Sequence, residues 1–277
     1  MFWLPAVILL SFGFGQLFKW SQRRGCCAPI VVSVNYLVLA AALALYYGLR
    51  GELFLTPPVL MVGAVTGAFF IVSMFSMTRA LEIADVGAVL TSFRLAIPLP
   101  IGAAVWLWNE TATASQFAGI LLALISLILM TWGKNGASKD SSGHLLLILL
   151  VFILQGLSQI CIHWVHHAGL DAQRQLVLLV TALTAGLLGS FFILVKGQRP
   201  TRKDLTMGAG IGLFNLVALM AILTALSKIQ GTIFFPLQGC AVVIMDNLFA
   251  HFIWRESLSR SALAGAGLGA LAMLLIL

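Results

Sequence analysis

Apolar runs of about twenty residues follow one another along this chain, separated by short polar stretches. A helix needs about 20 apolar residues to cross the hydrocarbon core of a bilayer, which is roughly 30 Å thick. Cutting the chain at its polar residues gives ten such runs. We expect helices at 2–18, 28–49, 57–77, 86–108, 113–133, 144–166, 174–196, 204–227, 232–253 and 257–277. The pattern therefore predicts an all-α integral membrane protein with ten transmembrane helices.

The composition supports a multi-pass protein of the cell membrane, inner or plasma. Hydrophobic residues make up 61% of the 277 positions and charged residues 9%, whereas a soluble domain carries about 25% charged residues. The first residues are apolar and lack a basic n-region, so we expect a retained span in place of a cleaved signal peptide. The ten runs leave no length for a soluble domain, so we expect a lipid bilayer as partner and no nucleic acid.

Two segments of the chain each have a similar second copy later in the sequence, at nearly the same offset. "GAVTGAFF" (63–70) matches "GAGIGLFN" (208–215), which places Gly67 and Gly212 145 positions apart. "WNETATASQFAG" (108–119) matches "WRESLSRSALAG" (254–265) at an offset of 146. Matches in constant order and nearly constant register indicate an internal repeat.

The repeat divides the chain into two five-helix halves. We place them at 1–133 and 144–277, joined by a polar linker at 134–143. Five is an odd number, so the second half has to enter the membrane from the opposite face. Inverted repeats of this kind build one central binding site in many secondary transporters.

A further set of matching residues suggests a family. These residues are Gly13 and Lys19 in the first run, the glycines of the third and eighth runs, Ala80-Leu81 and Ala225-Leu226, and Glu110 and Glu256, each followed nine residues later by Gly119 or Gly265. With them the chain resembles a ten-helix, EamA-type member of the drug/metabolite transporter superfamily. The resemblance implies a basket of helices that moves by alternating access. It also implies a central cavity lined mainly by spans 1, 3, 4, 6, 8 and 9.

Polar residues deep in the spans are the candidate binding residues, because burying them in lipid is costly. The amides among them either join helices to one another or line the cavity, and both readings stay open. We single out as substrate-binding candidates Arg94, Asp246, Asn215, Gln238, Gln159, Gln16 and Asn35.

Arg94 and Asp246 are the two formal charges within this set. Counted from the same face, they lie roughly 12 and 10 Å deep in their spans, so they can meet if spans four and nine are neighbours. We expect Arg94 to bind an anionic group of the substrate, while Asp246 releases it or takes a proton or an amine. The alternative is a static salt bridge.

Other conspicuous residues have structural interpretations. Glu110 and Glu256 each precede a span, where a carboxylate meets the positive end of a helix dipole, and with Gly67 and Gly212 we interpret them as structural hinges. "HWVHH" (163–167) places His163 and His167 one turn apart, as in a metal or proton site. Because this end of the helix carries no carboxylate on the same turn, we interpret the pair as interfacial and expect no metal.

We therefore expect a secondary transporter of a small polar or amphipathic metabolite, such as an amino acid or an organic acid. The expected direction of transport is export. Coupling to a proton or a counter-substrate stays open. One alternative is an exporter of cationic drugs, and another is a scaffold or sensor that does not transport. No catalytic motif such as HExxH, a P-loop or GxSxG occurs, so we expect no enzyme and no cofactor.

Charge bias predicts the orientation in the membrane. Among the basic residues of loops and helix ends, Arg50, Arg174 and Lys228 lie on the face that holds both termini. The opposite face holds Lys19, Arg23, Arg24, Arg79, Lys134, Lys139, Lys196, Arg199, Arg202, Lys203, Arg255 and Arg260. The positive-inside rule places this second face in the cytoplasm and both termini outside. The family resemblance implies cytoplasmic termini instead.

Overall fold

The computed structural model describes residues 3–83, 93, 96–111, 113–131, 142–253 and 260–276. Every regular element in these ranges is helical, which confirms the all-α prediction for this part of the chain. The elements are α1 (Trp3–Arg23), α2 (Ala28–Arg50), α3 (Pro57–Ile83), α5 (Pro98–Trp108), α6 (Ala114–Thr131), α7 (Ser142–His167), the short 3-10 helix η1 (Asp171–Gln173), α8 (Arg174–Val195), α9 (Arg202–Leu226), α10 (Gly231–Phe252) and α11 (Arg260–Ile276).

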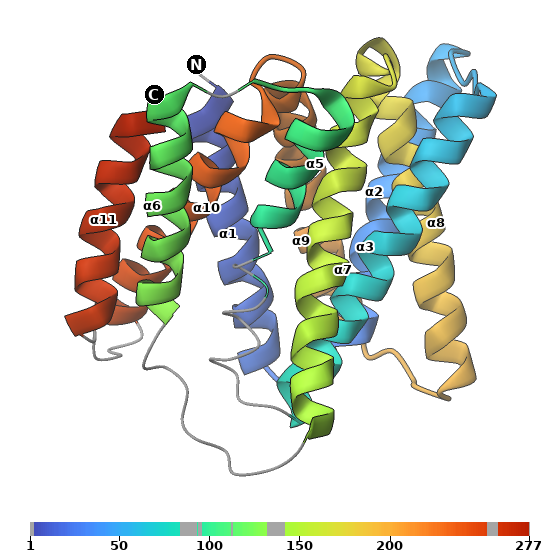
Figure 1. The fold of residues 1–277 in the computed structure, drawn as a ribbon. Coiled ribbons are helices and arrows are strands. Elements are labelled where there is room, and N and C mark those ends of the chain that lie inside the picture. The colour runs from blue at the N-terminus through green and yellow to red at the C-terminus, as the bar shows by residue number, and fades with distance from the viewer. Residues whose placement is uncertain are drawn as a thin grey trace.

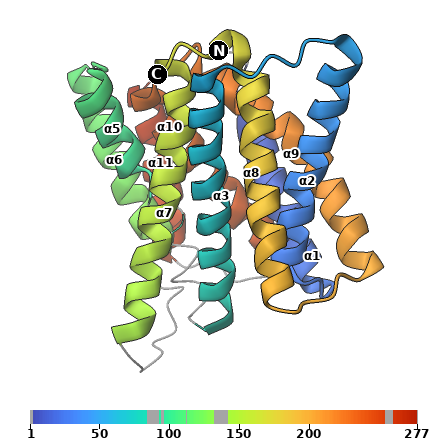
Figure 2. The same cartoon turned by 90° about the vertical axis from the view of Figure 1, so that its right-hand side faces the viewer.

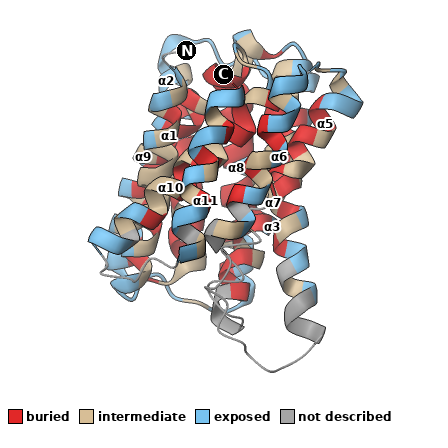
Figure 3. Cartoon of the chain, turned by 60° about the vertical axis from the view of Figure 1, so that its left-hand side comes forward, coloured by how far each residue is buried: buried red, intermediate tan, exposed pale blue. Residues whose placement is uncertain are grey.

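Seven of the described helices are long and apolar enough to cross a membrane. They are α1, α2, α3, α7, α8, α9 and α10. The apolar stretches of α5, α6 and α11 are shorter within the described residues. Figure 3 shows that buried residues face the interior of the bundle and exposed residues face outward. Large apolar side chains such as Leu49, Trp106 and Leu194 lie on that outer surface, as expected for a bundle surrounded by lipid.

Both termini lie at the same end of the bundle (Figure 1). Helix α1 runs away from this end and α7 runs toward it, so the two helices that open the halves are antiparallel. Helix α8 packs between α2 and α3, as Figure 2 shows, while α9 packs on α1 and α2 and α6 packs on α11. Helices from the two parts of the chain therefore interleave throughout the bundle.

Helix α3 approaches α8 most closely at two glycines. A Cβ on Gly63 would lie 2.6 Å from Cβ of Val180, and one on Gly67 would lie 2.4 Å from the carbonyl oxygen of Thr181. Both distances are shorter than van der Waals contact, so only glycine lets the two backbones approach this far.

Helix α9 contacts α2 in the same way. A Cβ on Gly208 would lie 2.7 Å from Cβ of Val34, and one on Gly212 would lie 2.6 Å from the carbonyl oxygen of Asn35. The contacted residues Val34 and Asn35 precede Val180 and Thr181 by 146 positions, and the glycines are 145 apart. Helices α3 and α9 thus each offer two glycines to a helix elsewhere in the chain, and both the glycines and the residues they contact recur at nearly the same offset.

The ends of α1 and α7, and those of α2 and α8, are alike and lie 144 and 146 positions apart in the sequence. After α1, Gly25 has a φ of 74° and Cys26 N donates to Ser21 O; after α7, Gly169 has a φ of 69° and Leu170 N donates to Val165 O. Glycine is favoured in this left-handed conformation because it has no Cβ. Helices α2 and α8 end in the same way at Gly51 and Gly197.

Candidate functional site

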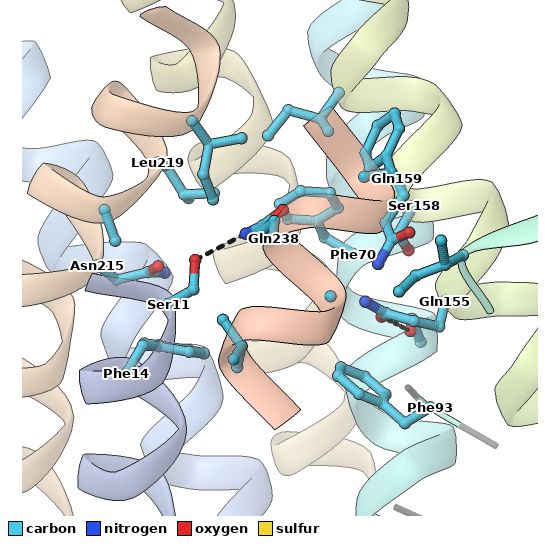
Figure 4. A pocket seen from close by; sticks show the side chains of 18 of the residues that line it. Ser11, Phe14, Phe70, Phe93, Gln155, Ser158, Gln159, Asn215, Leu219 and Gln238 are labelled. Carbon is cyan, nitrogen blue, oxygen red and sulfur yellow. Dashed lines mark hydrogen bonds between the residues drawn. The ribbon is translucent and has the colours of Figure 1, made fainter. Parts of the chain in front are cut away.

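A cavity of about 210 Å³ lies at the centre of the bundle, between α1, α2, α3, α7, α9, α10 and the residues before α5. Its lining combines amides, hydroxyls and aromatic rings with aliphatic side chains (Figure 4). In Figure 4, Asn215, Ser11 and Phe14 lie on one side, Gln155, Ser158 and Gln159 on the other, and Gln238 between them. The polar lining residues are Ser11, Tyr36, Ser73, Gln155, Ser158, Gln159, Asn215 and Gln238.

Three of these amides are held by neighbouring polar side chains. Gln238 Nε2 donates to Ser11 Oγ at 2.8 Å, which joins α10 to α1. Asn215 Nδ2 donates to the buried Asn35 Oδ1 at 3.1 Å, which joins α9 to α2. Ser73 Oγ donates to Gln155 Oε1 at 3.1 Å, which joins α3 to α7. Gln155, Asn215 and Gln238 therefore both line the cavity and connect helices. Asn35 connects helices but is not among the lining residues.

Gln159 differs from these three amides. Its Oε1 atom is buried and has no hydrogen-bond partner in the described structure. A buried acceptor without a donor costs about 1–3 kcal/mol, and most such atoms in folded proteins have a partner. Gln159 lines the cavity, so a turn of its amide toward the cavity would let a bound molecule with an N–H or O–H group supply that donor.

The described lining of the cavity carries no charged side chain. Arg94 lies outside the described residues, although its neighbour Phe93 lines the cavity. Asp246 is not among the lining residues, and its Oδ1 accepts a hydrogen bond from Gln16 Nε2 at 2.9 Å. The expected pair between Arg94 and Asp246 thus remains a prediction, and Gln16 contacts Asp246 beside the cavity.

Pro236 lies inside α10, which continues without a break from Gly231 to Phe252 and lines the cavity. Proline has no amide proton, so the carbonyl of Thr232 loses its usual partner within the helix. Gln238 follows Pro236 by two residues and lines the cavity.

Glu110 lies in a turn shaped by Asn109, which ends α5 with a φ of 52°. We expected the carboxylate at the start of the next helix, α6. Its Oε2 instead accepts from the backbone N of Thr232 at 3.0 Å, in the first turn of α10. Burial alone would raise the pKa of Glu110, but His163 and the backbone amides of Thr232 and Gly231 lower it to about 2. The carboxylate thus caps α10, a different helix from the one expected. Glu256 lies outside the described residues.

The two histidines of α7 lie inside the end of the bundle that holds both termini, and both contact Glu110. His163 is completely buried, and its Nε2 lies 3.1 Å from Glu110 Oε1. His167 is 21% exposed, and its Nε2 lies 3.2 Å from the same oxygen. Trp108 stacks on His167, with ring centroids 4.4 Å apart, and meets His163 edge to face. The neighbouring Asp171 pairs with His166, so the carboxylate that contacts His163 and His167 comes from the turn between α5 and α6.

Comparison with known proteins shows the fold. No family model matches this chain. A relative from Haemophilus influenzae (strain Rd), described only as an uncharacterized protein, is 22% identical over an alignment of length 266, which covers 91% of this chain and 89% of the relative. A crystal structure of another protein matches with a TM-score of 0.80 at 15% identity, over 99% of this chain and 94% of its own. At this identity the match shows a shared helical architecture.

Proposed function

We propose that this chain is a secondary transporter of the cell membrane for a small polar or amphipathic metabolite, such as an amino acid or an organic acid, in the direction of export. The observation that carries the proposal is the central cavity, whose amides and hydroxyls come from helices of both halves. Pockets with a few convergent polar groups in a mostly apolar wall are the usual form of a small-molecule site.

The packing of the helices supports two inverted five-helix halves that move by alternating access. The glycines of α3 contact α8 as those of α9 contact α2, and the helices that open the halves run in opposite directions. A pseudo-twofold axis in the membrane plane accounts for both facts. Together with the sequence features, this arrangement favours an EamA-type member of the drug/metabolite transporter superfamily.

The size and polarity of the cavity favour a small substrate with a hydrogen-bond donor. Pockets for drug-sized ligands typically measure about 300–1,000 Å³, whereas this one measures about 210 Å³. The free acceptor of Gln159 favours an amino, amide or hydroxyl group on the bound molecule. A cationic drug would favour a carboxylate in the wall, and the described lining contains none.

A ligand screen on the purified protein tests this proposal. We expect amino acids or small organic acids, but not large lipophilic cations, to raise the melting temperature. Replacement Gln159→Met keeps the length of the side chain and removes its acceptor, so it should reduce the shift caused by the active compound. The matched control Gln22→Met lies at the end of α1, outside the cavity, and should bind as the wild type does. A shift of equal size in Gln159→Met would contradict the assignment of the site.

A further inference from the structure

Three potential metal ligands meet at the end of the bundle that holds both termini. Glu110 comes from the turn after α5, and His163 and His167 come from successive turns of α7. Each offers one ligand atom, and the three atoms lie within 4.8 Å of one another. The transport proposal uses none of these residues.

The spacing suits a small divalent ion. Zinc binds histidine nitrogen and carboxylate oxygen at about 2.0–2.2 Å in tetrahedral geometry, so neighbouring ligand atoms lie roughly 3.3 Å apart. Glu110 Oε1 lies 3.1 Å from His163 Nε2 and 3.2 Å from His167 Nε2. Two of the three separations are therefore already close to those between metal ligands, and the third is no more than 4.8 Å.

His163 needs a partner that the described structure does not supply. The side chain is completely buried, and neither ring nitrogen makes a hydrogen bond of acceptable geometry, even though Nε2 lies close to Glu110. The ring is also fixed in place, because a Cβ on Gly231 would lie 2.4 Å from its Cε1 atom. A metal at Nε2 would satisfy this buried atom without moving the ring.

The surroundings orient the other two ligands. Glu110 Oε2 is occupied by Thr232 N and lies 3.3 Å from Thr232 Oγ1, which leaves Oε1 directed at the histidines. Trp108 lies parallel to the His167 ring, with an interplanar angle of 6°. Hydrogen bonds and packing that fix the direction of the ligands are typical of metal sites.

The residues at the equivalent positions of the internal repeat show how this cluster differs from an ordinary ion pair. At positions 144 earlier, Lys19 and Arg23 occupy the places of His163 and His167. Lysine and arginine pair with a carboxylate through their charge but have no free lone pair for a metal. A neutral histidine at these places gives up the charge and offers a ligand nitrogen instead.

We propose that Glu110, His163 and His167 form a binding site for a divalent transition metal of the zinc type, with the fourth position open to water. Two histidines, one carboxylate and one open position are a known ligand set for zinc. The bound ion would tie the turn after α5 and the end of α7 to the start of α10, and so hold this end of the cavity in its present arrangement.

The test is metal binding by the purified full-length protein after treatment with a chelator. We expect one Zn²⁺ per chain by elemental analysis, Co²⁺ spectra of tetrahedral type, and no retention of Mg²⁺. Changes outside the ligand set typically weaken metal binding about 10–100-fold. Loss of a direct ligand in His167→Ala or Glu110→Gln should therefore weaken it by at least about 100-fold.

Two control variants make the result specific. His166→Ala removes a histidine of the same helix whose Nδ1 lies 2.6 Å from Asp171 Oδ2, and it should bind Zn²⁺ as the wild type does. Cys27→Ser removes a partly exposed thiol that could bind the metal by itself. The proposal is overturned if the wild type binds neither Zn²⁺ nor Co²⁺, if the two ligand variants bind normally, or if a control loses the metal. If His167→Ala does not fold, His167→Gln replaces it, and normal Zn²⁺ binding by that variant is equally contradictory.

Discussion

Gly212 lies against the backbone of Asn35, so close that a Cβ on Gly212 would be 2.6 Å from the Asn35 carbonyl oxygen. The contact joins α9 to α2, and Asn35 in turn accepts a hydrogen bond from Asn215 beside the cavity. Packing between the two halves and the polar wall of the cavity therefore share one residue.

Replacement Gly212→Ala should lower the melting temperature and reduce transport, because the methyl group has to push the two backbones apart. Gly67→Ala should act alike, since its Cβ would lie 2.4 Å from Thr181 O. The control Gly210→Ala lies in the same helix with open space around it. It should gain up to about 0.5–1 kcal/mol from the better helix propensity of alanine. Thermal unfolding of the three variants in one detergent checks this, and a Gly212→Ala protein as stable as Gly210→Ala would exclude the packing role.

The side chains of Asn215 and Asn35 should be coupled in their contribution to the free energy of unfolding, because they share a hydrogen bond. Both side chains are buried, so Asn35→Leu leaves Asn215 without its acceptor and should cost about 1–3 kcal/mol. In the double variant Asn35→Leu with Asn215→Leu, the loss should be smaller than the sum of the single losses by at least about 0.5 kcal/mol. A double-mutant cycle of thermal stability measures this coupling, and strict additivity would rule it out.

A reporter fused to the C-terminus and active only in the cytoplasm should remain dark. Twelve basic residues on one face against three on the other place the termini outside. The control is the same reporter inserted in the linker at 134–143, on the opposite face, which should be bright. The reverse pattern would show that the orientation implied by the family resemblance holds instead.

Exchange of the two charges tests the role of Arg94 and Asp246. If the side chains pair, the double variant Arg94→Asp with Asp246→Arg should be as stable as the wild type. Each single variant should be less stable, because a lone charge in a span costs about 2.5–3.5 kcal/mol or more. We expect the exchanged protein to transport poorly, because an anionic substrate group would then meet a carboxylate. Transport at the wild-type rate would reduce the pair to a structural salt bridge.

The positions of the helices could be read from the sequence because apolar length is a local property. The run expected at 174–196 is α8 (Arg174–Val195), and the one expected at 28–49 is α2 (Ala28–Arg50). The run expected at 2–18 extends to Arg23, because the amphipathic end of α1 continues past the apolar stretch.

The contacts of Glu110 could not be read in the same way, since they depend on how distant helices meet. The sequence indicated a carboxylate at a helix start but not that the helix is α10, which begins about 120 positions later. The contacts of His163 and His167 with this carboxylate could not be read for the same reason. One available signal was the repeat, which aligns these histidines with Lys19 and Arg23, two cations that would also suit a carboxylate.

Transport by the purified protein in sealed lipid vesicles tests the central claim most directly. The substrate is the metabolite found by the ligand screen, loaded on one side with and without a proton gradient. We predict saturable flux through the wild type that falls strongly in Gln159→Met and is unchanged in Gln22→Met. Flux no greater than in empty vesicles, for a compound that binds and is tested in both directions, would contradict the account and favour a scaffold or sensor with this fold.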